Sequence, residues 1–176
     1  MSPLFKPVAP RAVVDAAGLP RSERPLAAAQ AEDGTWLLGT RDALVLVVSG
    51  QDSMRIPWER LESAEWERDE ERLQIIEVAD FGRPRPVRTY VLRDPGQMLA
   101  LVRERVTASV VLQRRVVVAR RKGLTVIARR PPAGGAITWA YRFDPGVEPD
   151  DPEVRRIAEE GLRAAAEELG EAGDPI

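Results

Sequence analysis

The chain has 176 residues, of which 44% are hydrophobic and 31% charged, and its net charge is −2. This composition is that of one globular domain, or one domain with an appendage, and it provides no overall field that would recruit nucleic acid or an anionic membrane. Neither cysteine nor histidine occurs, which excludes disulfides, thiol nucleophiles, zinc-thiolate sites and every Ser-His or Cys-His catalytic arrangement.

Signals for export or membrane insertion are not found. The N-terminal residues have no apolar core of signal-peptide length, and the longest apolar run, Ala43–Val48, falls far short of the roughly 20 residues that cross a bilayer. We therefore expect a cytoplasmic protein without a transmembrane segment. Arginine greatly outnumbers the two lysines, Lys6 and Lys122, a bias that is typical of GC-rich genomes and indicates an actinobacterial source.

The first 24 residues are rich in proline, and the pattern changes after them. Prolines at positions 3, 7, 10 and 20 predict a loosely ordered N-terminal arm, with room for one helical turn at 12–17. From Pro25 onward, strands are predicted over 25–32, 35–40, 43–48 and 53–57. Asp33-Gly34 is the first hairpin turn, because glycine supplies the positive φ that a tight turn needs.

Residues 58–78 are open to two interpretations. Their glutamate and arginine content favours a helix by propensity. The β-branched Ile75-Ile76 run, and the loss of helical apolar spacing after Ala64, favour two strands with a turn near 69–71. We expect the two strands.

One more strand, at 87–92, precedes a helix predicted over 95–113. Asp94 is its expected N-cap, and Pro95 lies in its first turn. The valine-rich end of this helix, at 110–112, could instead open a strand, because β-branched side chains favour extended backbone.

The last third of the chain predicts three further strands, at 116–119, 124–128 and 137–143, and an amphipathic helix over 151–169. Asp151 is the N-cap of this helix, Pro152 takes its first position and Gly170 is a stop signal.

Seven strands followed by one helix is the element order of a pleckstrin-homology-like (PH-like) domain. Two motifs support the comparison. Gly39-Thr40-Arg41-Asp42-Ala43-Leu44 leads into an apolar strand, and Ile56-Pro57-Trp58-Glu59-Arg60-Leu61 leads into the strands that follow. On these residues the chain resembles the bacterial PH-like and GRAM-like group over about residues 20–113. Residues 114–176 resemble the tail of an uncharacterised actinobacterial family.

The resemblance implies an α+β fold in which a PH-like antiparallel β-barrel of about seven strands is plugged by the helix. Two orthogonal sheets leave an open corner, which Leu99, Val102 and Val106 would fill. The expected organisation is an arm at 1–24, a PH-like domain at 25–113 and an extension at 114–176, made of a three-stranded β region and the terminal helix.

A run of cations is the sharpest charge feature. Residues 114–130 hold seven cations and no acid, namely Arg114, Arg115, Arg120, Arg121, Lys122, Arg129 and Arg130. Such a run can bind nucleic-acid phosphates or lipid headgroups. The alternative is a solvated hairpin whose charge is balanced by the eleven acids between Asp144 and Asp174. No aromatic residue interleaves the run, which weakens a single-strand nucleic-acid interpretation.

The other candidate sites have simpler explanations. In a PH-like fold, lipid headgroups meet basic residues in the first hairpin loop, but here that loop is Glu32-Asp33-Gly34, which argues against phosphoinositide binding. The cluster Arg83, Arg85, Arg88 and Arg93 and the acidic run 59–71 are typical of solvated surface. Trp58 and Trp66 are core aromatics unless they are exposed, in which case they would mark a partner groove.

The first functional hypothesis is a non-catalytic PH-like interaction module that binds a protein partner or a second copy of itself, by strand addition or apolar docking. The alternative is an anion or nucleic-acid binder that uses the arginine-rich hairpin at 114–130. No catalytic, cofactor-binding or metal-ligating constellation is predicted.

Overall fold

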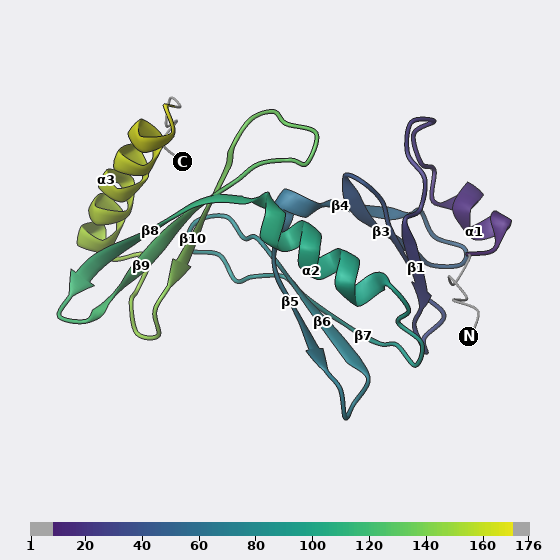
Figure 1. Cartoon of the computed structure of the whole chain (residues 1–176). Coiled ribbons are helices and arrows are strands. Elements are labelled where there is room, and N and C mark those ends of the chain that lie inside the picture. The colour runs from purple at the N-terminus through teal and green to yellow at the C-terminus, as the bar shows by residue number, and fades with distance from the viewer. Residues whose placement is uncertain (1–8, 171–176) are drawn as a thin grey trace, which may run out of the picture.

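The computed structural model describes residues 9–170, and within that range the chain forms three antiparallel sheets and three α-helices (Figure 1). The mixed α+β class expected from the sequence is therefore confirmed. The elements lie in two parts that follow each other along the chain. We call residues 9–109 the N-terminal lobe and residues 110–170 the C-terminal lobe.

The N-terminal lobe contains a four-stranded sheet, β1 to β4, and a three-stranded sheet, β5 to β7, each in sequence order. Its elements are α1 (Arg11–Ala16), β1 (Ala27–Gln30), β2 (Trp36–Gly39), β3 (Ala43–Val47), β4 (Met54–Pro57), the 3-10 turn η1 (Trp58–Arg60), β5 (Leu61–Glu67), β6 (Arg72–Glu77), β7 (Val87–Val91) and α2 (Met98–Ser109). All seven predicted strands are present, and the expectation of two strands within 58–78 is confirmed.

The two sheets are not closed into one barrel by strand pairing within the described residues. At one corner the chain passes from β4 to β5 through η1. At another, the Glu32 amide donates to the Val91 carbonyl over 3.0 Å, which ties the end of β1 to β7. The PH-like barrel implied by the resemblance is thus not seen in its closed form.

The helix predicted over 95–113 is shorter at both ends. Asp94 does not cap it, because its Oδ1 accepts from the Gly96 amide over 3.3 Å and Gly96 turns the chain with φ 49° before α2 starts at Met98. At the other end, α2 stops at Ser109, and the valines that follow open β8. The strand alternative left open for this segment is therefore the correct one.

One hydrophobic core fills the space between the two sheets and α2. From the helix it takes Met98, Val102 and Val106, each at most 9% exposed, and from the sheets it takes fully buried side chains such as Leu37, Leu44, Trp58, Leu61 and Ile75. Val102 and Val106 are thus plug residues as expected. Leu99 is only partly buried, and Met98 takes its place in the core.

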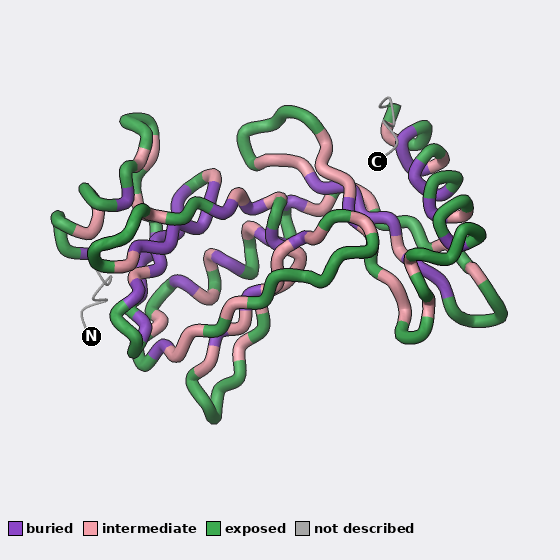
Figure 2. The backbone as a smooth tube through the Cα atoms, turned by 180° about the vertical axis from the view of Figure 1, so that it is seen from behind, coloured by how far each residue is buried: buried purple, intermediate pink, exposed green. Residues whose placement is uncertain are grey.

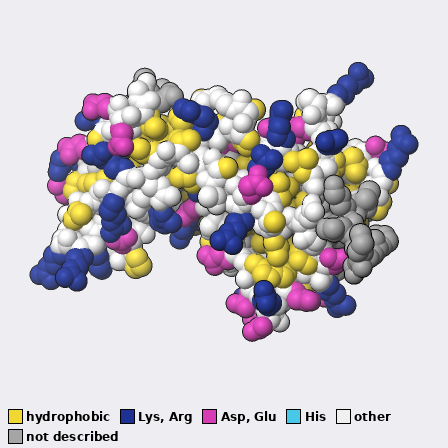
Figure 3. All heavy atoms as spheres, viewed as in Figure 1, with side chains coloured by type: hydrophobic (Ala, Val, Ile, Leu, Met, Phe, Trp, Pro, Cys, Tyr) yellow, Lys and Arg dark blue, Asp and Glu magenta, His cyan; other side chains and the backbone are white. Residues whose placement is uncertain are grey.

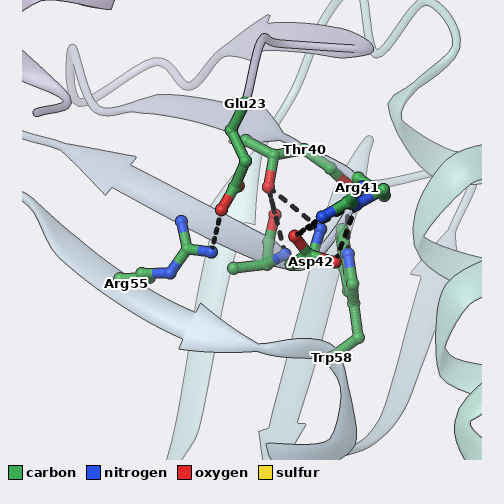
Figure 4. Close-up of polar contacts among 7 residues, drawn as sticks. Glu23, Thr40, Arg41, Asp42, Arg55 and Trp58 are labelled. Atoms are coloured by element: carbon green, nitrogen blue, oxygen red, sulfur yellow. Dashed lines mark hydrogen bonds and ion pairs between the residues drawn. The ribbon is translucent and has the colours of Figure 1, made fainter. Parts of the chain in front are cut away.

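The two motifs that carry the PH-like resemblance meet in space (Figure 4). Thr40 Oγ1 accepts from the amides of Asp42 (3.3 Å) and Ala43 (3.1 Å) and closes the β2–β3 turn. The Trp58 Nε1–H donates to the Thr40 carbonyl over 3.1 Å, and the Trp58 side chain is fully buried. A buried indole satisfies its polar group in this way, so both motifs have a structural role.

The described part of the N-terminal arm lies on the outer face of the β1–β4 sheet. Ala9 and Ala17, at the two ends of α1, are buried with Leu38 and Val45. The Glu23 carboxylate accepts from Arg55 of β4 over 2.6 Å (Figure 4). Residues 9–24 therefore have fixed contacts with the sheet.

The C-terminal lobe is a sheet of β8 (Val110–Ala119), β9 (Lys122–Arg129) and β10 (Thr138–Phe143), in the order β10-β9-β8, with α3 (Pro152–Leu169) on one face. The terminal helix agrees with the prediction and all three strands are present, but β8 begins at Val110, ahead of the predicted start at residue 116. Asp151 accepts from the Glu153 amide over 2.8 Å, and Gly170 ends the helix with φ 67°. Gly161 allows α3 to approach the sheet, because a Cβ there would meet Val116 Cγ2 at 2.7 Å.

The two lobes are joined by a buried arginine. Arg129 of β9 is 3% exposed. Its guanidinium donates to the Val106 carbonyl (3.2 Å) and Ser109 Oγ (2.7 Å) at the end of α2, and to the Glu62 carbonyl (2.7 Å) in β5. Burial lowers the pKa of Arg129, and the nearby Glu62 carboxylate opposes that shift.

A loop of the N-terminal lobe adds a second contact between the lobes. Phe81, between β6 and β7, meets Tyr141 and Phe143 of β10 edge to face, with ring centroids 5.0 and 5.3 Å away.

Figure 2 shows that buried positions gather on the facing sides of sheets and helices, whereas the hairpin ends are exposed. The lobes therefore share buried contacts at the joint.

The first prediction concerns this joint. Arg129→Met keeps apolar bulk but leaves the Glu62 carbonyl without its donor, while the Val106 carbonyl still accepts from Ser109 Oγ, so we expect it to lower the free energy of unfolding in urea by about 2 kcal/mol. Arg24→Met, at an exposed position outside the joint, is the control and should change it by less than about 0.5 kcal/mol. Equal effects of the two variants would contradict the structural role of Arg129.

Candidate functional site

The seven cations of the predicted basic patch do not form one surface. Arg114 pairs with Glu168 of α3 over 3.2 Å, and Arg115 pairs with Asp144, which follows β10. Arg129 is buried at the joint. Arg130 is half-buried just beyond β9, where its amide donates to the Ser109 carbonyl over 2.8 Å. Part of the run is thus balanced by the acidic C-terminal segment, as the solvated-hairpin alternative requires.

Three cations remain together at the end of the β8–β9 hairpin. Ala119 pairs with Lys122, so Arg120 and Arg121 form a two-residue turn. All three of Arg120, Arg121 and Lys122 are exposed, and within residues 9–170 none of them forms an ion pair. Figure 3 shows the resulting dense group of Lys and Arg side chains at the lower left, at the far end of the hairpin. We call these three residues the hairpin tip.

Asp144, which follows β10, forms hydrogen bonds with residues of both strands of this hairpin. Its carboxylate accepts from Arg115 (Nη1 to Oδ1, 2.8 Å) and from the Gly123 amide (2.9 Å). Arg115 also donates to the Arg121 carbonyl over 3.3 Å. The hydrogen bonds from Arg115 and then from Gly123, helped by the charges of Arg115 and Lys122, lower the pKa of Asp144 to about 2.

The two tryptophans proposed for a partner groove lie in different environments. Trp58 is 0% exposed and belongs to the core, so it lines no groove. Trp66 is half-buried and lines a hollow of about 410 Å³ between α2 and the β5–β6 hairpin. Its lining residues are Ala64, Trp66, Leu73, Leu99, Ala100, Val102 and Arg103. We call this hollow the α2–β5 groove.

The groove combines an apolar lining with a strand edge. Trp66 and Ala64 come from β5, which is the edge strand of its sheet, and Leu73 of β6 lies opposite Trp66. Ala100 and Arg103 are exposed one turn apart on α2. Trp66 was expected from the sequence as a groove residue, and Leu99 and Val102 as plug residues of the helix. The other lining residues were not, because the packing of α2 against β5 is a tertiary contact.

The remaining charged clusters are largely paired. Three of the four arginines in the 83–93 cluster contact glutamates: Arg85 with Glu62 (2.9 Å), Arg88 with Glu77 (2.6 Å) and Arg93 with Glu32 (2.5 Å). Among the residues that the structure describes, no group of three or more acidic side chains is placed to hold a metal ion. In the same range, no helix has the length and apolar character needed to span a bilayer.

The second prediction concerns Asp144. A pKa depressed from 3.8 to about 2 means that this carboxylate stabilises the fold fully above pH 3.8, and that the contribution is lost as pH falls toward 2. We expect the fall in Tm of the parent chain across this window to become shallower in Asp144→Asn. Asp52→Asn, at an exposed loop position, should leave the slope unchanged. Parallel curves for the parent and Asp144→Asn would contradict the assignment.

Comparisons with known proteins return no relative. No family model matches the chain, and neither the curated proteins nor the solved structures yield a match.

Proposed function

We propose that this protein is a non-catalytic interaction module with a PH-like N-terminal lobe, and that it binds an extended segment of a protein in the α2–β5 groove. The segment belongs either to a partner or to a second copy of the chain. The observation that carries the proposal is the apolar groove that lies along the edge strand β5, with Trp66 in its wall.

The element order supports the PH-like part of the proposal. Sheets of four and three strands are followed directly by α2, whose Val102 and Val106 enter the core between them. The contact of Trp58 with Thr40 joins the two motifs on which the resemblance was noted. Histidine and cysteine are absent from the sequence, and no catalytic constellation was identified in it.

The groove has the features of a peptide site. An edge strand offers unpaired backbone groups to an added strand. Alternate side chains of the added strand would meet the apolar lining of the groove. That lining includes the half-buried Trp66, and tryptophan is a residue type that often dominates binding energy. Arg103, on the helix side of the groove, would form an ion pair with an acidic side chain of the ligand. The expected ligand is therefore an extended segment with alternating apolar residues and one acid.

The third prediction tests this groove. Random peptides displayed on phage and selected on the full chain should converge on such sequences. Ala100→Gln places a polar side chain over the groove without changing the core, because Ala100 is exposed. We expect it to weaken binding of a selected peptide at least tenfold in fluorescence anisotropy, a loss of about 1.4 kcal/mol.

Ala108→Gln makes the same change at an exposed position of α2 outside the groove, and it should leave peptide affinity unchanged. Sedimentation at several protein concentrations tests the self-binding form, because a dimer that Ala100→Gln dissociates would place a second copy in the groove. Peptides that bind Ala100→Gln as well as the parent chain, together with a monomer at all concentrations, would overturn the proposal.

A further inference from the structure

The hairpin tip is separate from the α2–β5 groove, whose lining contains none of its three residues. Its turn is unusual, because Arg120 has a φ of 51°, in the left-handed region. Two-residue hairpin turns place glycine or asparagine at such positions, since a bulky side chain there is strained. The chain thus keeps an arginine where backbone geometry favours glycine, and so holds three consecutive cations at the most distal point of the hairpin.

An exposed apolar side chain lies beside these cations. Val117 is 59% exposed, more than any other large hydrophobic residue in the described part of the chain. Its cross-strand partner is Gly123, which has no side chain to cover it. Glycine is required there, because a Cβ would lie 1.9 Å from the Val116 carbonyl oxygen. The strand pairing itself therefore leaves Val117 open.

We propose that the hairpin tip docks on an anionic lipid surface, with Arg120, Arg121 and Lys122 against the headgroups and Val117 at the apolar boundary. Cations near an anionic leaflet each contribute to binding, and a nearby apolar side chain adds to it. A convex tip with three cations fits a broad surface. With three cations it can neutralise only a few phosphates and release few counterions, so its affinity for nucleic acid at moderate salt is low.

The neighbouring acid Asp144 lowers the positive charge of the hairpin tip only in part. Asp144 is already engaged by Arg115 and by the Gly123 amide, and the charge of Lys122 acts on it as well. Lys122 is directed toward the same loop, since its Nζ would lie 2.8 Å from a Cβ at Gly146. Arg120 and Arg121 are therefore the stronger determinants, and the test is built on them.

The fourth prediction uses the full chain and vesicles. Vesicles with about 30% phosphatidylserine should bind the protein at about 0.1 M salt, while pure phosphatidylcholine vesicles should not. Arg120→Gly should weaken the partition coefficient about fivefold, and Arg120→Gly with Arg121→Gln about 25-fold, since each cation near the surface is worth about 1 kcal/mol. Arg120→Gly should also raise Tm, because it relieves the left-handed arginine.

Two matched controls distinguish vesicle binding by the hairpin tip from binding that depends only on net charge. Arg21→Gln with Arg24→Gln makes the same change in net charge at exposed positions elsewhere, and it should bind vesicles like the parent. Val117→Thr, nearly isosteric, should weaken binding about threefold, whereas Val111→Thr, farther along β8, should not.

Three outcomes would overturn the proposal. One is the absence of binding to the anionic vesicles at low salt. Another is an equal loss of binding in the Arg21/Arg24 control. The last is tight binding of a short duplex DNA that depends on Arg120 and Arg121 but not on Val117, which would assign the tip to nucleic acid instead. None of these results involves Ala100, so they are distinguishable from failure of the groove proposal.

Discussion

The arrangement of the two lobes depends on the buried guanidinium of Arg129. One side chain from β9 reaches the end of α2 through Val106 and Ser109, and reaches β5 through the Glu62 carbonyl. The carbonyls at a helix C-terminus favour a cation, which offsets part of the desolvation of the charge. The offset is incomplete, because Arg129 Nε is buried without a hydrogen-bond partner in the described structure. Arg129 thus fixes the geometry between the lobes, although burying its guanidinium is unfavourable in free energy.

Glu62 links the Arg129 contact to the loop between β6 and β7. While its backbone carbonyl accepts from Arg129, its carboxylate accepts from Arg85 in the loop that also holds Phe81. Residue 62 lies where the pairing of β5 with β6 shifts register. Such an irregularity frees a carbonyl from the strand ladder, so the bulge and the buried arginine are complementary features of one joint.

Much of the fold could be predicted from the sequence, because its signals were local. Turn glycines, the β-branched run at 75–76 and the capping residues of α3 each fix structure over a few positions. The end of α2 stayed open to two interpretations, since Val110-Val111 are compatible with either a helix or a strand until β9 is present to pair with them. The basic run stayed open to two interpretations for a related reason. Strand alternation and tertiary contacts send Arg114, Arg115 and Arg129 to three different environments.

The joint has a consequence for how the lobes become stable during synthesis. All strands of the N-terminal lobe and α2 are complete by residue 109, but the guanidinium that joins the end of α2 to the Glu62 carbonyl of β5 comes from residue 129. A nascent chain that ends between these points leaves the Glu62 carbonyl in the β5 bulge without this donor, whereas the Val106 carbonyl still accepts from Ser109 Oγ. A fragment cut near residue 113 would therefore keep its helix but lack the side chain that ties the end of that helix to β5.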